Sequence, residues 1–335
     1  MKAFCLIFLL LTAGNALAQD IHFSQFGKSP LNLNPSYAGF FEGDYRFSGI
    51  HRNQWKSVTV PFKTFSGSFD LKHGMASREN AWLGAGLVLN SDKAGDADFG
   101  ITQAGFNLSY INCIGSSGKH FISFGLQPSF TQQSLNYTKL TFDNQFDGDV
   151  FNPGIPASEI FSNDKFVYFD LAAGVTYLYK PSDRFQIGGG FSIHHLLKPS
   201  YSFYKNSDAK LPVKTSIDIR SSIGITEKML LLPSVLFSTQ EKFRETVPGA
   251  NLKFIMNEKP GRKINLYAGL YARTGDALIP MVGLDYNELN LGISYDVNTS
   301  DLKRASNSRG GYEIALTYII TKVKPIGIKP PCPVY

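Results

Sequence analysis

The sequence QAGFNLSYINCIGSSGKHFISFGLQPSF, residues 103–130, decides the fold, because its side chains alternate in character on both sides of a short polar turn. Apolar residues recur at every second position in the two halves: Ala104, Phe106, Leu108, Tyr110, Ile122, Phe124, Leu126 and Phe130. A period of two places one face of a strand in apolar surroundings and the other face in polar ones. The stretch therefore predicts two antiparallel strands joined by a turn.

The same alternation recurs along most of the chain. It predicts about fourteen strands of roughly ten residues each. We place them near residues 43–52, 62–70, 81–90, 99–111, 119–131, 167–179, 184–194, 213–226, 228–239, 245–256, 262–272, 277–286, 289–298 and 310–321. The alternation is weak in the first and ninth of these segments.

A water-soluble β-sandwich and a membrane β-barrel both produce alternating strands, and three features favour the barrel. The predicted strands have the length of about 9–11 residues that crosses a bilayer at a tilt. Aromatic residues gather near strand ends, where a barrel places its interfacial girdle: Phe121, Phe130, Tyr179, Phe185, Tyr286 and Tyr312. The third feature is the length of the connections, which discriminates best.

Long and short connections alternate along the predicted strands. If the segment before the first strand lies on the periplasmic side, the outward-facing connections are the long ones, at 53–61, 91–98, 132–166, 195–212 and 299–309. Outer-membrane barrels have short periplasmic turns and longer outer loops, whereas a sandwich has no reason to sort its loops in this way. The sequence thus predicts an all-β, transmembrane, antiparallel up-and-down barrel of about fourteen strands, of the outer-membrane type.

Composition excludes several other classes of protein. The 335 residues include 27 Phe, 16 Tyr and 31 Gly, and only 18% of them are charged, which excludes a disordered chain and a coiled coil. The net charge is +6, but the 33 Lys and Arg are scattered without a dense basic run. We therefore expect no nucleic acid among the partners.

The first residues predict export to the cell outer membrane. Lys2 precedes an apolar stretch at 3–11, and the small-residue pattern Ala16-Leu17-Ala18 follows it. This arrangement is typical of a secretory signal peptide, at 1–18, that is cleaved after Ala18. Beyond Gln19 no apolar run approaches the length of about 18 residues that a membrane helix requires.

Charged side chains on the polar face of the strands are predicted to line the lumen. A Lys or Arg that faces lipid at the middle of the bilayer costs about 2–4 kcal/mol, and an acid somewhat less. The predicted lumen-lining residues are Asp170, His194, Asp218, Arg220, Arg273, Asp285, Asp296 and Glu313. Because both signs of charge share this face, the sequence argues against a strongly ion-selective pore.

Two segments break the strand pattern. Residues 19–43 read QDIHFSQFGKSPLNLNPSYAGFFEG, where Pro30, Pro35 and Gly39 interrupt any regular ladder. The second segment is Arg52-Asn53-Gln54-Trp55, at the outer end of the first predicted strand.

Together these segments resemble the PorP/SprF family of outer-membrane proteins, which is associated with the type IX secretion system and gliding motility. The resemblance rests on Phe23-Ser24-Gln25, Pro30-Leu31, Leu33-Asn34-Pro35-Ser36, Ala38-Gly39 and Arg52-Asn53-Gln54-Trp55. It continues through Phe169-Asp170-Leu171, Gly174, His195-Leu196, Pro199 and the stretches 271–277, 283–286 and 292–298. It covers essentially the whole mature chain.

The resemblance implies a non-catalytic barrel, without a cofactor, that supports export or surface attachment of cargo proteins such as large adhesins. It implies periplasmic and outer-membrane type IX secretion components as partners, besides the outer-membrane lipid. A passive porin for small solutes is the alternative interpretation, and an outer-membrane enzyme is the third. A porin has an open lumen and steady conductance, whereas a secretion component binds a protein and can be plugged.

Both irregular segments have more than one interpretation. The segment at 19–42 folds into the lumen as a plug, docks a periplasmic partner, or merely packs the barrel mouth. The candidates for the first two roles are Phe23, Ser24, Gln25, Asn34, Pro35 and Gly39. The cluster of Arg52, Asn53, Gln54 and Trp55 either contacts cargo from an outer loop or anchors the strand at the membrane interface.

No metal site is predicted. The acids of the 132–166 connection, Asp143, Asp147, Asp149 and Asp164, lack a regular calcium-ligand spacing, so a solvated loop is the preferred interpretation. The tail at 322–335 is rich in Lys and Pro and is expected on the periplasmic side. Cys332 in this tail and Cys113 in the 112–118 turn then share an oxidising compartment, but no feature fixes their separation.

Catalysis has little support in the sequence. The least implausible set is His194 with Ser192 and Asp218, which would have to meet across strands without any local motif. His194 and His195 are consecutive in a predicted strand, so we expect their rings on opposite faces. Polar residues of these types are also expected in any lumen.

Overall fold

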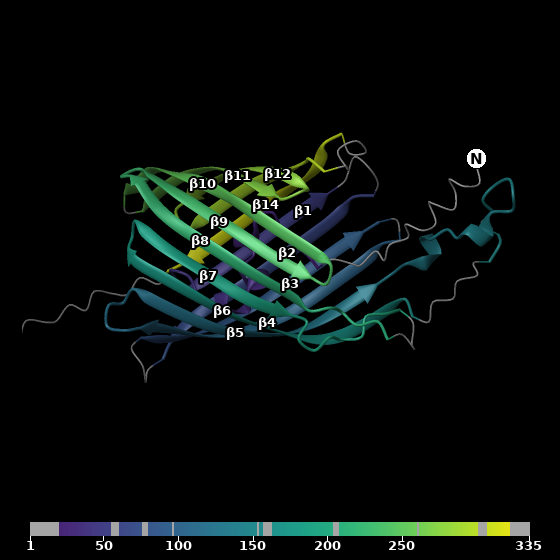
Figure 1. The fold of residues 1–335 in the computed structure, drawn as a ribbon, viewed down its shortest axis with the longest axis horizontal. Coiled ribbons are helices and arrows are strands. Elements are labelled where there is room, and N and C mark those ends of the chain that lie inside the picture. The colour runs from purple at the N-terminus through teal and green to yellow at the C-terminus, as the bar shows by residue number, and fades with distance from the viewer. Residues whose placement is uncertain are drawn as a thin grey trace, which may run out of the picture.

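The computed structural model describes residues 20–54, 60–75, 80–95, 97–152, 154–156, 163–203, 208–259, 261–300 and 307–321. Its strands form one closed barrel of fourteen, β1 to β14 (Figure 1). Each strand pairs antiparallel with the next strand in the chain, and β14 (Arg309–Ile320) closes the barrel on β1 (Tyr45–Gln54). This confirms the predicted outer-membrane type of barrel.

All the predicted segments overlap an observed strand. The others are β2 (Phe62–Gly74), β3 (Ala81–Ala94), β4 (Phe99–Ile114), β5 (His120–Ser134), β6 (Lys165–Ser182), β7 (Phe185–His194), β8 (Lys214–Thr226), β9 (Met229–Gln240), β10 (Phe243–Lys259), β11 (Arg262–Arg273), β12 (Ala277–Tyr286) and β13 (Leu289–Asn298). The predicted bounds of β12 and β13 are correct, whereas β6 is the longest at 18 residues and extends past its prediction at both ends.

Closure of the barrel gives the backbone N–H and C=O groups of the strands hydrogen-bond partners within the protein, which the hydrocarbon of a membrane cannot provide. In hydrocarbon every N–H and C=O group needs a partner within the protein, so a membrane-spanning sheet leaves no free edge. The closing ladder between β1 and β14 runs without interruption from Tyr45↔Ile320 to Gln54↔Gly311. No helix among the described residues is long and apolar enough to span a membrane.

The two faces of the strands differ as the alternation predicts. Large apolar side chains such as Leu89, Phe130 and Val282 point outward and are 60, 61 and 57% exposed, which is the surface that lipid requires. The inward face carries polar side chains that are buried, including Asn107 and Ser123. Burial of polar groups inside the barrel shows that the lumen is filled rather than open throughout.

The weak alternation of β1 and β9 has a physical cause in the lumen. Ile50 of β1 points inward and packs against Phe23 of the N-terminal segment. Leu236 of β9 points inward and packs with Phe26 and Leu33 of the same segment. Apolar residues on the inward face thus mark where the N-terminal segment packs against the wall.

The connections differ between the two ends of the barrel. We call the end where β1 begins the short-turn end and the opposite end the long-loop end. The connections at 135–164 and 195–213 belong to the long-loop end, which in outer-membrane barrels faces the cell exterior. The predicted strict alternation is wrong, because the connections 241–242 and 274–276 are tight turns at the long-loop end. The longest connections nevertheless all lie there.

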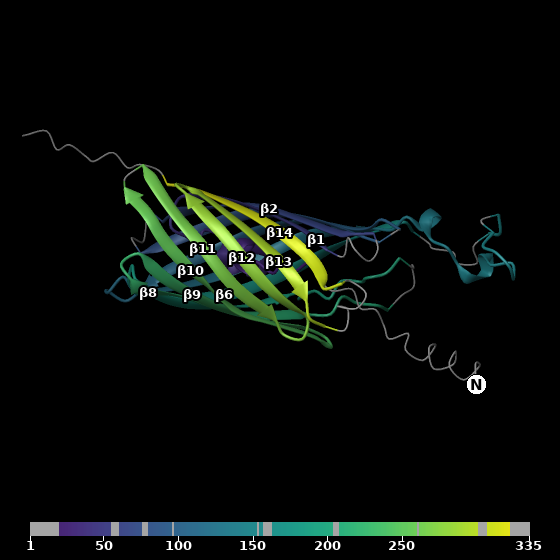
Figure 2. The same cartoon turned by 90° about the horizontal axis from the view of Figure 1, so that it is seen from above.

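The connection between β5 and β6 extends away from the long-loop end (Figure 2). It contains η3 (Tyr137–Lys139) and η4 (Asp143–Gln145). Its carboxylates bind the loop's own backbone: Asp147 Oδ1 accepts from the N–H groups of Asp149 and Val150 at 3.1 and 3.0 Å. Within the described part of the chain, no group of His, Cys, Asp and Glu is arranged to hold a metal ion.

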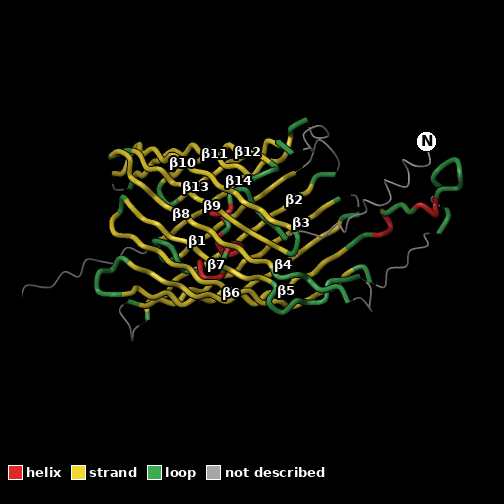
Figure 3. Tube along the Cα trace, in the orientation of Figure 1, coloured by secondary structure: helices red, strands yellow, loops and turns green. Residues whose placement is uncertain are grey.

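The residues before β1 lie inside the barrel. They form η1 (Phe26–Lys28), α2 (Pro30–Leu33) and η2 (Pro35–Tyr37), which Figure 3 shows as short helical turns within the ring of strands. Pro30 and Pro35 begin two of these turns, at a position where the N–H that proline lacks has no intrahelical partner.

The N-terminal segment crosses the lumen from the long-loop end to the short-turn end. Asp20 contacts His195, directly after β7, and Lys214, at the start of β8, and both of these residues lie at the long-loop end. Asp44 precedes β1 at the short-turn end. Only the part of the segment next to β1 therefore reaches the short-turn end, and the rest lies within the lumen.

Candidate functional site: the plug and its contacts

We call residues 20–44 the plug. Its core is tightly packed, since Leu31 and Ala38 are fully buried and Asn34 is 1% exposed. Phe26 and Leu33 pack in one apolar cluster with inward residues of β9 to β12. The plug is thus held in part by hydrophobic contact with the wall.

Polar side chains of the wall satisfy backbone carbonyl groups of the plug. Inward Ser and Gln residues donate hydrogen bonds of 2.6–3.1 Å to plug carbonyls: Ser109 to Ala38, Ser123 to Ser36, Gln127 to Leu31 and Ser192 to Leu33. A buried polar group that loses its partner destabilises the fold by about 1–3 kcal/mol. The irregular plug therefore depends on a matched set of wall side chains.

Asn34 anchors the middle of the plug to β6 and β7. Its Nδ2 donates to the carbonyl oxygens of Val175 and Phe191, both at 3.2 Å. The wall has glycine at the two facing positions: a Cβ at Gly190 would lie 2.6 Å from Asn34 Nδ2, and one at Gly174 would overlap Asn34 Oδ1. Close approach of the plug requires these glycines.

Gly39 marks the point where the plug turns toward β1. Its N–H donates to Asp70 Oδ2 at 2.8 Å, and Arg46 donates to both oxygens of the same carboxylate at 2.9 and 2.7 Å. The φ angle of Gly39 is 66°, and a Cβ there would lie 2.8 Å from the Cα of Gly84. Both the backbone conformation and the space require glycine.

A cluster of buried charged side chains lies near the long-loop end, and we call it the carboxylate clamp: Arg52, Glu245, Arg273, Asp296 and Glu313. Arg52 pairs with Asp296 at 3.0 Å and with Glu313 at 3.3 Å. Arg273 pairs with Asp296 at 3.0 Å and with Glu245 at 2.9 Å. These side chains are at most 6% exposed, and charges this buried require such partners because each lost hydration shell costs several kcal/mol.

The carboxylate clamp binds the plug at Ser24 and Gln25. Glu313 accepts hydrogen bonds from both successive backbone N–H groups, at 2.7 and 2.9 Å. The Ser24 hydroxyl donates to Asp296 and accepts from Arg273, each at 2.7 Å. The clamp has more carboxylates than guanidinium groups. The N–H and hydroxyl groups of Ser24 and Gln25 provide the further hydrogen bonds that stabilise these negative charges.

A histidine between two carboxylates holds the outer end of the plug, and we call Asp20, Asp170 and His195 the histidine latch. His195 Nε2 lies 2.7 Å from Asp20, and its Nδ1 lies 2.5 Å from Asp170. Burial disfavours the imidazolium, but the two carboxylates outweigh it and raise the pKa of His195 to about 9. Burial also opposes ionisation of Asp20, yet His195 and Lys214 hold its pKa far below the usual range.

The residues proposed from the sequence for plugging or docking all lie inside the lumen: Phe23, Ser24, Gln25, Asn34, Pro35 and Gly39. Their side chains or backbone groups hold the plug against the wall, and Ser24, Gln25 and Gly39 also line the two larger cavities of the lumen. The plug residues at the short-turn mouth are Phe40, Phe41 and Glu42, and Glu42 is exposed.

The prediction of an outer-loop position is wrong for Arg52. β1 continues to Gln54, two residues past its predicted end, and its alternation turns Arg52 inward into the carboxylate clamp. Arg52 is 1% exposed and also donates to the carbonyl of His22 at 2.7 Å. Asn53 and Gln54 occupy the last positions of β1, and Trp55 lies outside the described residues.

The structure places the predicted lumen residues on the inward face of their strands. Asp170, Arg273, Asp296 and Glu313 belong to the latch or the clamp. Asp218 accepts hydrogen bonds from Tyr37 at 2.7 Å and Arg220 at 3.0 Å, and Asp285 accepts from Asn265 at 2.9 Å.

His194 and His195 differ from their prediction, because both border the same small cavity. β7 ends at His194, and His195 has a φ of 61°, so strand alternation stops between them. Ser192 and Asp218, the other members of the least implausible catalytic set, have partners in the plug: Ser192 donates to Leu33 at 2.8 Å. These groups hold the plug in place.

The periplasmic predictions are described only in part. Cys113 lies in β4 near the short-turn end as a buried free thiol. Cys332, the tail at 322–335 and the signal peptide at 1–18 lie outside the described residues.

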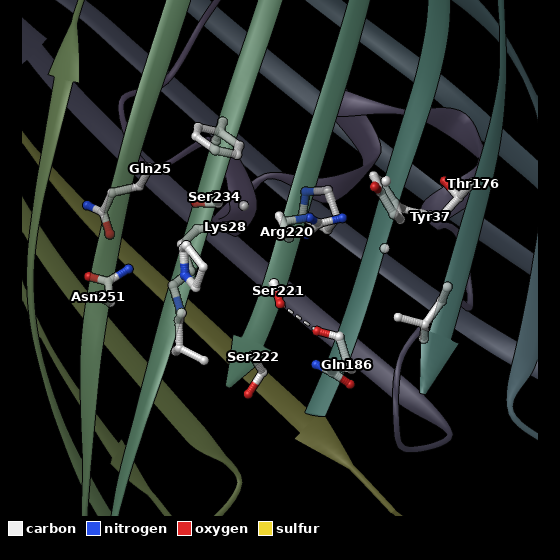
Figure 4. Close-up of a pocket in the computed structure, with 18 of the residues that line it drawn as sticks. Gln25, Lys28, Tyr37, Thr176, Gln186, Arg220, Ser221, Ser222, Ser234 and Asn251 are labelled. Carbon is white, nitrogen blue, oxygen red and sulfur yellow. Dashed lines mark hydrogen bonds between the residues drawn. The ribbon is translucent and has the colours of Figure 1, made fainter. Parts of the chain in front are cut away.

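The lumen is filled unevenly along its length. At the long-loop end, two cavities of about 60 and 40 Å³ remain beside the plug. Beside η1 lies a cavity of about 400 Å³, which is lined by the plug, by residues of β6 to β12 and by Arg46 of β1 (Figure 4). It shares the lining residues Gln186, Ser222 and Leu232 with a cavity of about 860 Å³ at the short-turn end. Among the described residues, the larger spaces of the lumen therefore lie toward the short-turn end.

The family of the protein follows from a match that includes both barrel and plug. A family model described as the type IX secretion system membrane protein PorP/SprF matches residues 15–318. The chain belongs to the PorP/SprF family. The family and the fold together place this PorP/SprF protein in the outer membrane, as a membrane component of the type IX secretion system.

Solved structures similar to this PorP/SprF protein support the fold alone. The toluene transporter TbuX of Ralstonia pickettii has a TM-score of 0.54 and 11% identity, over 88% of this chain and 93% of that chain. The toluene transporter TodX of Pseudomonas putida has a TM-score of 0.50 and 10% identity, over 87% and 93%. No curated protein matches the chain in sequence.

Several residues that hold the plug of this PorP/SprF protein were not among the site residues predicted from the sequence. Asp70 and Glu245 are single acids on the inward faces of β2 and β10, and nothing local distinguishes them from other lumen residues. A signal for Asp170 and His195 was present, since both lie in the motifs that resemble the family. Their pairing with Asp20 depends on tertiary structure.

Proposed function

We propose that this PorP/SprF protein is a non-catalytic component of the secretion system that supports export or surface attachment of cargo proteins such as large adhesins, and through them gliding motility. The observation that carries the proposal is that the family match extends over the plug as well as the barrel. The motif residues Ser24, Asn34, Gly39, Arg52 and Asp296 are the ones that fasten the plug to the wall.

The anchored plug favours this proposal over a passive porin. A porin requires a continuous water-filled path, whereas the clamp and the plug occupy the lumen near the long-loop end. The likeness to proteins named as toluene transporters makes a small-solute channel the second candidate. Because only 11% of the residues are identical, this likeness indicates a shared fold and does not indicate which solute is transported.

The two ends of the barrel suit different partners. Periplasmic secretion components would meet the short turns and the mouth of the plug at Phe40, Phe41 and Glu42. Cargo would meet the long-loop end, where the connection between β5 and β6 extends furthest. Loops on a rigid scaffold are where binding residues concentrate.

The test is purification of the tagged protein from its native outer membrane in mild detergent, with mass spectrometry of the proteins that remain bound. We expect type IX secretion components or a large adhesin, and their loss when residues 20–41 are deleted. The matched variant Gly49→Ala adds a methyl group to β1 where a Cβ meets no atom within 4 Å, and it should retain the cargo. Recovery of the barrel alone, with steady conductance in planar bilayers, would favour the small-solute channel.

A further inference from the structure

The cavity of about 400 Å³ ends inside the lumen, and we call it the chamber. The plug borders it through Phe26, Lys28 and Tyr37, and residues of β6 to β12 with Arg46 of β1 form its wall (Figure 4). We call the adjoining cavity of about 860 Å³ the vestibule. The vestibule lies among the short turns, so the chamber is reached from the periplasmic side.

The chamber has a cationic lining. Its charged lining residues are Lys28, Arg46 and Arg220, and no Asp or Glu is among the described residues that line it. The acids that pair with the arginines, Asp70 and Asp218, are excluded from the lining and lie behind them. The surface that faces the chamber therefore attracts an anion.

Arg220 is the most accessible of these arginines. Its side chain is 34% exposed, against 10% for Arg46. Its Nε donates to Asp218 at 3.0 Å, and its guanidinium lies 4.3 Å from the ring centre of Tyr37, so the group is held in one orientation. An arginine positioned in this way presents a planar fork to a carboxylate.

Two glycines leave the guanidinium of Arg220 uncovered. Gly188 of β7 is its direct partner in the β7–β8 register. On the plug side, even a Cβ added at Gly27 would lie 4.0 Å from Arg220 Nη1. A side chain at Gly27 would take space beside the guanidinium, whereas a Cβ at Gly188 would first meet Tyr177 O at 2.9 Å and Leu178 Cδ1 at 3.0 Å.

The rest of the lining suits an extended peptide. Gln186 and Ser222, which border both cavities, provide amide and hydroxyl groups that can bond a peptide backbone (Figure 4). Phe40, Leu178 and Leu232 provide apolar surface for side chains. A pocket of a few hundred Å³ with this mixture is typical of a specific ligand site.

We propose that the chamber binds the C-terminal end of an extended polypeptide, with its terminal carboxylate on Arg220 and its last side chains against Phe40 and Leu232. Only a chain end enters a closed chamber of this size without folding back. The cationic lining selects the carboxylate end over the ammonium end. The inference rests on the proposed function, because it names the part of a secreted client that the barrel holds from the periplasmic side.

The test measures binding of a short probe peptide to the purified full-length protein in lipid nanodiscs. The probe is fluorescein-Gly-Ser-Val-Leu-Phe, with either a free C-terminal carboxylate or a C-terminal amide, and the readout is fluorescence anisotropy. We expect the carboxylate form to bind about tenfold more tightly than the amide, as one charge-assisted hydrogen-bonding pair provides. Arg220→Gln should abolish this difference, and the exposed matched control Arg244→Gln should retain it.

A second variant keeps the test valid if Arg220→Gln loosens Tyr37 and the plug. Ser222→Leu fills the chamber without touching a charge, and it should weaken both peptide forms equally. Equal binding of carboxylate and amide by the native protein would overturn the proposal. So would stronger binding of dodecanoate than of the peptide, because it would identify an acyl chain as the occupant.

Failure of this inference is distinguishable from failure of the proposed function. If neither peptide binds but the protein still co-purifies with secretion components, the chamber is not the client site and the proposed function stands. If nothing co-purifies and the barrel conducts steadily, the proposed function fails. A preference for the carboxylate peptide that depends on Arg220 would still support the chamber as a peptide site.

Discussion

The two halves of the lumen contrast in how they are filled. In the half toward the long loops, the carboxylate clamp and the histidine latch fasten the plug, and the cavities there measure about 60 and 40 Å³. In the half toward the short turns, the chamber and the vestibule measure about 400 and 860 Å³. Among the described residues, the lumen is therefore filled more tightly toward the long loops than toward the short turns.

The difference shows how the two ends of a barrel with a regular wall come to differ in how tightly they hold the plug. Buried ion pairs are strongly position-specific, because breaking one leaves an uncompensated charge at a cost of about 3–5 kcal/mol. The clamp concentrates such pairs at one end, so the plug is fixed there. Residues Gly188 and Ser222 at the other end have little or no side chain, which leaves space. Most of the fastening therefore lies toward the long loops, while the Arg46–Asp70 pair holds the plug where it turns toward β1 and the larger spaces remain toward the short turns.

The largest effect is expected from deleting the plug, which makes the two halves of the lumen differ. Deletion of residues 20–41 removes the plug and leaves the closed ladder of strands intact, so the lumen should become a continuous water path. We expect steady currents in planar bilayers, where the native protein gives little conductance. A deletion variant that folds but does not conduct would show that other segments close the lumen.

The next effect comes from breaking the clamp at Glu313. Glu313→Gln removes the charge that pairs with Arg52 and that accepts from two plug N–H groups, which should weaken plug docking by about 3–5 kcal/mol. Hydrogen exchange at Ser24 and Gln25 should increase together with transient currents. Glu258→Gln changes an exposed acid at the short-turn end and should leave both unchanged. Unchanged exchange in the Glu313 variant would contradict the role of the clamp.

A smaller effect is expected at the glycine that faces Asn34. Gly174→Ala places a methyl group where Asn34 Oδ1 lies, so the plug must shift at a cost of about 1–3 kcal/mol. Thermal unfolding and plug exchange should both report it. Gly49→Ala is the matched control, since a Cβ there meets no atom within 4 Å. Asn34→Ala in the Gly174→Ala background should recover part of the loss.

The smallest effect is expected from pH at the histidine latch. The pKa of His195 is raised to about 9, so its ion pairs stabilise the plug fully below the unfolded pKa near 6.5 and are lost as pH rises through about 9. The groups around it are Asp20, Asp170, Lys214 and His194. Protection factors at Asp20 to His22, which correct for the base-catalysed rise in intrinsic exchange, should fall between pH 7.5 and 10, and His195→Gln should remove most of this fall. Protection factors that do not change with pH in the native protein would show that the latch contributes little.

Most of the barrel, and less of the plug, could be predicted from the sequence. The strand bounds of β12 and β13 followed from alternation alone. β1 was predicted to end at residue 52, two residues short, so Arg52 was assigned to the outer end of the strand and its loop instead of to the clamp. The error has a physical origin, since the inward apolar residue Ile50 packs on the plug and blurs the alternation.

The sequence by itself determined the closed barrel, because alternation with period two is a local property that survives without knowledge of any contact. It also determined that residues 20–44 are irregular, through Pro30, Pro35 and Gly39. Only the tertiary structure decided that this segment enters from the long-loop end and that Ser24 meets Glu313, Asp296 and Arg273. Such contacts join residues more than two hundred positions apart, and they exist only once the strands have closed around the plug.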